Sequence, residues 1–287
     1  MSSPEISFTH LVTMETDPQR PLFYPFPSLS MESHKLRALM ITVDYVRELV
    51  FLYDEDRQIH TFNKQLQHLN QFKLNFHVES ITTAPDSNLI FLKQSLCKET
   101  FIQVVDMFSG SLVTSWKLSS CHMGITCDSS GNLYTCDYLN SRIKIFDMFE
   151  PVSTSFTLSP MNFQLTPYTV KLAPDKFSIL VQNLEPAFFF QVYDLCGNLL
   201  KTFSNNKENY VRDSFTTANM NCAIVCIHHE LHFLDQQSDT MITLGGFGRT
   251  IGSFIRPFAI AFLPPDLFII CNESVSYPIQ CLNFQPF

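Results

Sequence analysis

Glycine and charged residues are scarce in this sequence. Only 8 of its 287 residues are glycine, and Asp, Glu, Lys and Arg together make up 16%. With so few glycines, turns have to rely on Asp, Asn, Ser and Pro, which favour turn conformations through their side chains or ring. The low charge and the 45% content of hydrophobic residues exclude a disordered chain, because disorder needs the opposite balance.

Long apolar runs, a secretory signal and a regular cysteine pattern are also missing. The most apolar stretch, FAIAFLPPDLFIIC, is interrupted by Pro264, Pro265 and Asp266. No segment reaches the roughly 20 apolar residues that span a bilayer. The amino-terminal stretch Met1–Arg20 lacks a basic region followed by an apolar one. The nine cysteines have no repeated spacing, which is typical of reduced thiols. We therefore expect a cytoplasmic protein that is not bound to a membrane.

What the sequence does contain is 28 phenylalanines and an internal repeat. The clearest unit, GITCDSSGNLYTCDYLNSRIKIFD at Gly124–Asp147, reads as three short apolar strands separated by polar turns. Its closing pattern, two apolar residues followed by Asp or Asn, returns every 41 to 48 residues. The closing positions are Asn63, Asp106, Asp147, Asp194, Asp235 and Asn283. The turn after the first strand keeps a similar period, at Asp44, Asp86, Asp128, Asp175, Asn221 and Asp266.

Each period holds four short strand-like runs and no helical pattern. A four-stranded sheet every ~40–45 residues is the signature of a propeller blade. We therefore predict an all-β fold, a single six-bladed β-propeller of four-stranded antiparallel blades over residues 1–287. Only FQPF follows Asn283, so the last blade lacks an outer strand of its own. The segment Ile6–Met14 is predicted to fill that place and to remove the exposed sheet edge.

The Gly124–Asp147 unit resembles an NHL repeat, the repeat found in the propeller domain of the TRIM-NHL family. The matching residues are Asp128, Gly131, Asn132, Asp137, Asn140, Arg142, Phe146 and Asp147. Gly245–Leu263 is similar to the glycine-rich lead-in between NHL blades. The match is specific in blade three, partial in blades one, two, four and six, and weak in blade five. The resemblance implies a platform that binds protein or RNA. The chain has no RING or B-box spacing and no coiled coil, so it carries no ubiquitin-ligase machinery of its own.

Some related six-bladed propellers are metal-dependent hydrolases or lyases, and this is a second alternative. A calcium site needs about 6–8 oxygen ligands that converge. The expected inner strands offer only Glu79 and His122 near the channel entrance. His228, His229 and His232 form the one dense histidine group, but adjacent strand residues point to opposite faces. We therefore predict no catalytic residue, no metal and no cofactor, and a protein that is not an enzyme.

The leading hypothesis is a protein-interaction adaptor or scaffold that binds partners through the top face of the propeller. This face is formed by the loops between blades and by the loops between the second and third strands of each blade. The residues predicted to bind are Tyr138, Asn140, Arg142, Tyr168, Arg256 and Phe258. Arg142 has an alternative role, since it can brace neighbouring blades. The turn residues Asp86, Asp175 and Asp266 on the bottom face are expected to serve backbone geometry. We expect a monomer.

Binding of single-stranded RNA is the alternative from another class of function. The net charge is −8 and the isoelectric point is about 5.5, so the protein as a whole does not attract phosphate backbones. The top-face loops carry nearly equal numbers of basic and acidic residues, whereas RNA binding favours a basic face. A local patch around Arg249 and Arg256 keeps the RNA alternative open.

Overall fold

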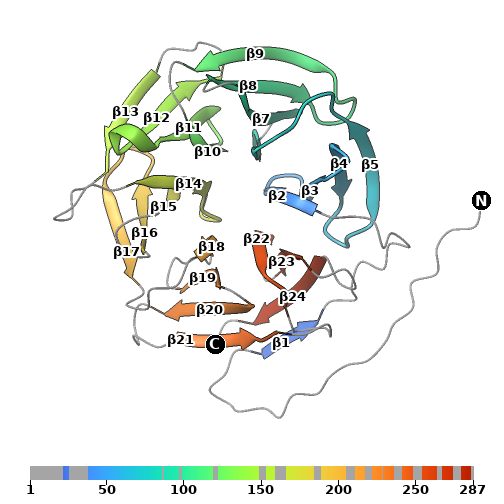
Figure 1. Cartoon of the computed structure of the whole chain (residues 1–287), viewed down its shortest axis with the longest axis vertical. Coiled ribbons are helices and arrows are strands. Elements are labelled where there is room, and N and C mark those ends of the chain that lie inside the picture. Colours follow the sequence, from blue (N-terminus) through green and yellow to red (C-terminus); the bar gives the residue numbers. More distant parts are fainter. Residues whose placement is uncertain are drawn as a thin grey trace, which may run out of the picture.

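The strands form a ring of sheets around a common centre (Figure 1). The computed structural model describes residues 22–25, 38–85, 87–96, 99–118, 122–148, 153–158, 166–183, 189–204, 211–216, 222–227, 229–235, 241–247, 254–263, 267–273 and 279–285. Within these residues there are six four-stranded sheets, and neighbouring strands in each sheet are antiparallel. The predicted β-propeller of four-stranded antiparallel blades is therefore confirmed.

The blades follow one another in chain order and are numbered 1 to 6. Blades 1 to 3 consist of β2 (Ala38–Asp44), β3 (Leu49–Asp54), β4 (Gln58–Phe62) and β5 (His68–Lys73), then β6 (Ser80–Thr83), β7 (Leu89–Leu96), β8 (Glu99–Asp106) and β9 (Leu112–Leu118), then β10 (Met123–Cys127), β11 (Asn132–Asp137), β12 (Arg142–Asp147) and β13 (Ser153–Thr157). A short 3-10 helix, η1 (Tyr138–Asn140), links β11 to β12.

Blades 4 to 6 repeat this arrangement, and the first strand of each blade lies nearest the centre of the ring (Figure 1). They consist of β14 (Pro167–Leu172), β15 (Ser178–Asn183), β16 (Phe189–Asp194) and β17 (Leu199–Ser204), then β18 (Val211–Thr216), β19 (Cys222–Ile227), β20 (Glu230–Asp235) and β21 (Met241–Gly245), then β22 (Pro257–Leu263), β23 (Leu267–Asn272), β24 (Ile279–Gln285) and β1 (Leu22–Pro25).

Blade 6 is completed by a strand from the amino-terminal part of the chain. Its strand order is β1-β24-β23-β22, and Leu22 pairs with Gln285. The predicted position of this strand was wrong, because the strand beside β24 is β1, and Ile6–Met14 lies outside the described residues. β1 is only four residues long and ends in proline, so no alternating pattern marks it. A proline without an N–H is tolerated there because the strand lies at the edge of its sheet.

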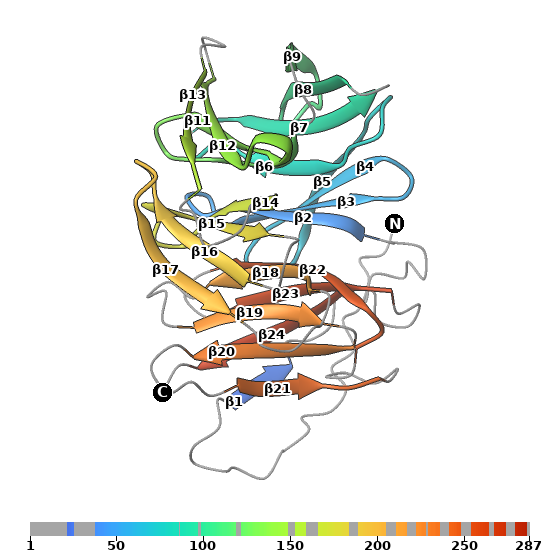
Figure 2. The same cartoon turned by 60° about the vertical axis from the view of Figure 1, so that its left-hand side comes forward.

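The second strands of blades 1, 4 and 6 are buried between neighbouring sheets. All six residues of β3, of β15 and of β23 are buried. These strands are short continuous apolar runs, the pattern expected when both faces of a strand are covered. Viewed after a turn of 60°, the blades lie face against face (Figure 2). The prediction that such runs lie buried between sheets is confirmed for these three strands.

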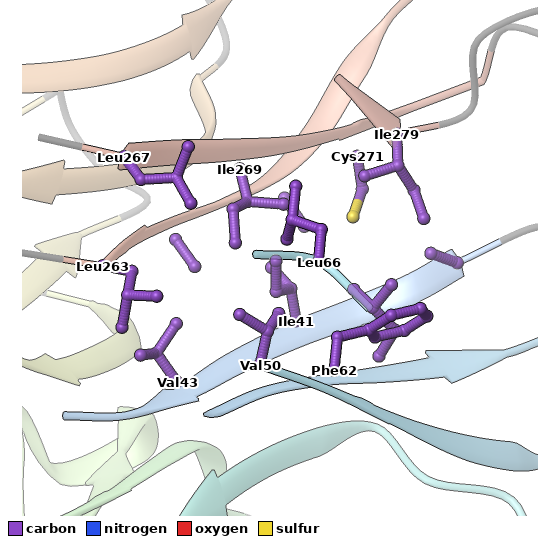
Figure 3. Packing of buried hydrophobic residues seen from close by; sticks show 14 residues of the cluster. Ile41, Val43, Val50, Phe62, Leu66, Leu263, Leu267, Ile269, Cys271 and Ile279 are labelled. Carbon is purple, nitrogen blue, oxygen red and sulfur yellow. The ribbon is translucent and has the colours of Figure 1, made fainter. Parts of the chain in front are cut away.

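The hydrophobic core consists of layers between neighbouring blades. One layer, here called the blade 1–6 layer, joins the first blade to the last (Figure 3). In it, Val50 and Phe62 from blade 1 meet Leu263 and Ile269 from blade 6, and all four side chains are inaccessible or nearly so. Further layers lie between blades 1 and 2, 2 and 3, and 3 and 4. The ring is therefore stabilised by contacts that each blade makes with its neighbours.

The repeated aspartates hold the turns that follow the first strands. The Asp128 carboxylate accepts hydrogen bonds from the backbone N–H groups of Ser130 and Asn132, at 2.8 and 2.9 Å. Asp44 and Asp175 accept backbone N–H groups in the same way in blades 1 and 4. The structural role expected of Asp175 is confirmed by these bonds. Asp86, Asn221 and Asp266 lie outside the described residues.

Candidate functional site

The inner strands enclose a cavity of about 180 Å³ at the centre of the ring. Its lining comes from β2, β6, β10, β14 and β22. Tyr45, in the turn after β2, packs against the blade 1–6 layer and also against the layer between blades 3 and 4. Blades 1 and 4 face each other across the ring (Figure 1). Tyr45 lines the cavity and contacts layers on both sides of it. Burial, and the nearby Asp175 charge, raise the pKa of Tyr45, and its hydroxyl stays protonated.

Polar side chains on the channel wall connect neighbouring blades. Three hydroxyl groups form such bonds, each to the backbone of an adjacent blade. The pairs are Thr83 Oγ1 with Val43 O (3.2 Å), Ile125 N with Ser80 Oγ (3.2 Å), and Leu172 N with Thr126 Oγ1 (2.8 Å). Lys171 extends from β14 and donates to the Ile260 carbonyl on β22 at 2.9 Å. These groups hold the ring together, which gives the channel wall a structural role.

Glu79, predicted to lie near the channel entrance, does lie in the cavity lining. Its carboxylate accepts hydrogen bonds from the Lys93 ammonium at 2.5 Å and from the Ser95 hydroxyl at 2.7 Å. Burial opposes ionisation of Glu79, but the bonds from Lys93 and Ser95 outweigh it and hold its pKa below the usual range. Lys93 is 2% exposed, so Glu79 compensates a buried cation.

His122, the other entrance residue, is buried between blades 2 and 3. Its Nδ1 lies 2.8 Å from the Thr135 hydroxyl, and its ring packs edge-on against Phe146 at a centroid distance of 6.0 Å. Burial, with the nearby Lys144 charge, lowers the pKa of His122 to about 4. The imidazole is therefore neutral in the folded protein at neutral pH.

This burial makes stability fall on acidification. The unfolded chain takes up a proton on His122 near the ordinary pKa of 6.5, whereas the folded protein resists it down to about pH 4. Between these values the free energy of unfolding decreases by up to about 1.4 kcal/mol per pH unit. His122→Gln retains a hydrogen-bonding group but cannot be protonated. We expect its free energy of unfolding, measured by urea titration at several pH values, to lose this part of the pH dependence. An unchanged slope in the variant would assign the acid sensitivity to other groups.

The turn between β11 and β12 carries three of the predicted binding residues. The Asn140 amide donates to both carboxylate oxygens of the buried Asp137, at 2.9 Å each. Asn140 therefore holds the shape of the turn, which reduces the case for it as a contact residue. Tyr138 is half-buried, and Arg142 is exposed at the start of β12. Leu139, which was not predicted, is 57% exposed.

The bracing role considered for Arg142 finds no ion pair among the described residues to support it. Its side chain is exposed, and among the described residues it forms no ion pair. Arg142 therefore keeps its guanidinium available on the top face.

The other predicted residues lie elsewhere on the ring. Tyr168 is half-buried on β14 of blade 4. Phe258 on β22 lines the cavity and packs against the blade 1–6 layer, so it serves largely as part of the channel wall. Blade 3 and blade 6 lie on opposite sides of the ring (Figure 1). The six predicted residues therefore do not form one contiguous site.

A second group of top-face residues surrounds Arg256 and is here called the His229 site: His229, Phe247, Arg256 and Glu273. His229 lies between β19 and β20, and its Nδ1 accepts the Arg256 backbone N–H at 3.0 Å. The Phe247 ring packs edge-on against the imidazole at a centroid distance of 4.9 Å. The Arg256 guanidinium donates to the Glu273 carboxylate at 3.2 Å. This group joins blades 5 and 6, because one imidazole contacts both the Phe247 ring and the Arg256 backbone, and the Arg256 guanidinium contacts Glu273.

Sequence reasoning found Arg256 but missed its three neighbours in the His229 site. The signals were present, because Phe247 stands in the GGFG segment and His229 in the histidine group. His228 lies outside the described residues, and His232 Nε2 contacts the Glu230 carboxylate at 2.9 Å. In the described part of the chain, no three His, Cys, Asp or Glu side chains group as metal ligands would. The described residues also contain no helix with the length and apolar character needed to cross a membrane.

Comparison with known proteins places the chain by fold. No protein-family model matches it, and no curated protein matches it in sequence. The β-propeller domain of Cps50 (Swd1) from Myceliophteria thermophila aligns with a TM-score of 0.63 at 9% identity, over 87% of this chain and 97% of that one. Hydrazine synthase from Kuenenia stuttgartiensis aligns with a TM-score of 0.60 at 12% identity, over 83% and 75% of the two chains. At such identities the likeness concerns the fold alone, and the chain is similar to these proteins as a β-propeller.

Proposed function

We propose that this protein is a non-catalytic, NHL-type propeller that binds partner proteins through its top face, as an adaptor or scaffold. The observation that carries this proposal is the pairing of exposed apolar and arginine side chains on that face. Leu139 and Arg142 are both exposed in one turn of blade 3, and Phe247 and Arg256 are both exposed and both contact His229. Aromatic residues and arginine are enriched among the residues that carry binding energy in protein interfaces.

The charge distribution favours a protein partner over RNA. Arg256 is accompanied by Glu273, and Lys117 by Glu99, so these described top-face cations have acidic partners. Binding to a phosphate backbone needs a field of uncompensated cations. The described polar groups of the channel also favour binding over catalysis. Glu79 is held by Lys93, and His122 is buried, whereas a catalytic acid or base has to reach its substrate.

The proposal predicts which variants lose partners. Phe247 and Phe177 are both 74% exposed, but Phe247 is on the top face and Phe177 is in the bottom turn between β14 and β15. The tagged wild type and variants are used to capture partners from native lysate, with and without RNase. We expect Phe177→Ser to retain the partners and Phe247→Ser or Arg142→Gln to lose them. The expected loss is about tenfold or more, the usual effect of removing an interface anchor.

Folding of each variant is verified first by its melting temperature. Capture lost only in Phe177→Ser would place the interface on the bottom face. Capture that RNase abolishes would support the RNA alternative instead. If none of the variants changes what is captured, the top-face proposal is wrong.

A further inference from the structure

One imidazole fixes the positions of an exposed phenylalanine and an exposed arginine. His229 accepts the Arg256 backbone N–H through Nδ1, and its ring forms a T-shaped contact with Phe247. Phe247 and Arg256 lie on either side of the loop that connects β21 to β22. Their relative position therefore depends on a third residue that comes from a different turn of blade 5.

The backbone at both sides of this loop is also fixed. The Phe254 N–H donates to the Gly246 carbonyl at 2.9 Å, and the Phe254 side chain is completely buried. Gly246 has a φ of 151°, and a Cβ there would meet open space, so glycine is required by conformation rather than by contact. Arg256 has a φ of 50°, an uncommon value for a residue with a side chain. The fold thus holds an arginine in a conformation that costs energy, which fixes the backbone at this end of the loop.

Solvent reaches the two groups that this arrangement holds. Phe247 is 74% exposed, and the Arg256 side chain is 54% exposed. The guanidinium contacts Glu273, whose side chain is 41% exposed. An exposed ion pair of this kind contributes only about 0–1 kcal/mol, so an incoming carboxylate can replace it. The nearby Glu230 carboxylate is occupied by His232.

We propose that the His229 site binds a segment of a partner protein in which Asp or Glu stands next to an aromatic or large apolar side chain. This inference rests on the proposed function and names the partner chemistry for one of its surfaces. The Arg256 guanidinium takes the carboxylate, for which its planar set of donors is suited. The Phe247 ring takes the apolar neighbour. A phosphomonoester fits less well, because its second negative charge would face Glu273 with a single guanidinium to balance both.

A random twelve-residue peptide library displayed on phage tests this chemistry, with the folded protein immobilised. The enriched peptides should carry an acid within two positions of an aromatic or large apolar residue. A synthetic copy of the most enriched peptide is then titrated by fluorescence anisotropy. Phe247→Ser and Arg256→Gln should each weaken it by about tenfold or more, and Phe177→Ser should leave it unchanged.

Two more variants separate positioning from contact. His229→Asn keeps an acceptor for the Arg256 N–H but has no ring for Phe247, so the peptide should bind more weakly than to the wild type and more tightly than to His229→Ala. Glu273→Gln removes the competing carboxylate and should strengthen binding by about two- to threefold. If these residues had a purely structural role, the substitutions would lower the melting temperature. Glu273→Gln would then not strengthen peptide binding.

The proposal is overturned if the library gives no enriched peptide, or if the enriched peptides lack acids. It is also overturned if Glu273→Gln weakens binding, or if a uridine oligonucleotide binds at Arg256 and the peptides do not. The wider proposed function fails separately. Native partners that are lost in Arg142→Gln but retained in Phe247→Ser and Arg256→Gln would leave the top face in use and the His229 site without this role.

Discussion

Removing residues 1–26 should destabilise the protein severely, because it deletes β1. Strand β24 then loses the partner that pairs with Leu282 to Gln285, and blade 6 is left with three strands and an open edge. The loss of about four backbone pairings at about 1 kcal/mol each lowers the melting temperature by roughly ten degrees in a chain of this size. An exposed edge next to a buried strand also promotes aggregation. Differential scanning fluorimetry and light scattering on heating measure both effects.

A shorter truncation provides the matched control. Deleting residues 1–15 removes Ile6–Met14 but leaves β1 in place, so its melting temperature should stay close to that of the intact protein. If both truncations keep the melting temperature of the intact protein, β1 contributes nothing to ring closure. If the shorter one is already as unstable as the longer one, the segment before β1 contributes to stability as well.

Phe62→Ala should cost about 3–5 kcal/mol in the free energy of unfolding, since it opens a cavity in the blade 1–6 layer. Phe62 is completely inaccessible and packs in the layer where the first blade meets the last (Figure 3). This layer has to form between strands that are far apart in the sequence, so weakening it opens the ring. Urea denaturation, monitored by far-ultraviolet circular dichroism, measures this change in the free energy of unfolding.

Phe177→Ala is the control for this substitution, because the same atoms are removed from a side chain that is 74% exposed. Its effect should stay within about 0.5 kcal/mol. Equal effects at Phe62 and Phe177 would show that the blade 1–6 layer does not limit stability. If Phe62→Ala instead reduces the slope of the free energy of unfolding against urea concentration and leaves the midpoint unchanged, the blades unfold separately.

The exposed apolar side chains are not confined to the top face. Phe177, Leu199 and Leu200 are exposed at the bottom end of blade 4, where the sequence predicted only residues that serve turn geometry. The aspartates there do serve the turns, as the bonds of Asp175 and Asp194 show. The prediction holds for these aspartates and not for the whole face, which is why Phe177 is a necessary control in the binding experiments.

By itself the sequence determined the blades. An apolar run such as Leu49–Asp54 is long enough for one strand and too apolar for an exposed one, so it predicts a strand covered on both faces. The turn at Asp128 follows from local chemistry, because the carboxylate bonds N–H groups two and four residues further on. Both features depend on residues close together in the chain, and their repetition revealed the period.

Only the tertiary structure decided how distant segments meet. β1 has four residues and no periodic pattern, so its place beside β24 follows from pairing across nearly the whole length of the chain. His229, Phe247, Arg256 and Glu273 come from three separate loops, and no spacing between them predicts that one imidazole would contact both the ring and the backbone of its neighbours. Pairing and packing between blades depend on the closed ring, a long-range property that local sequence patterns do not encode.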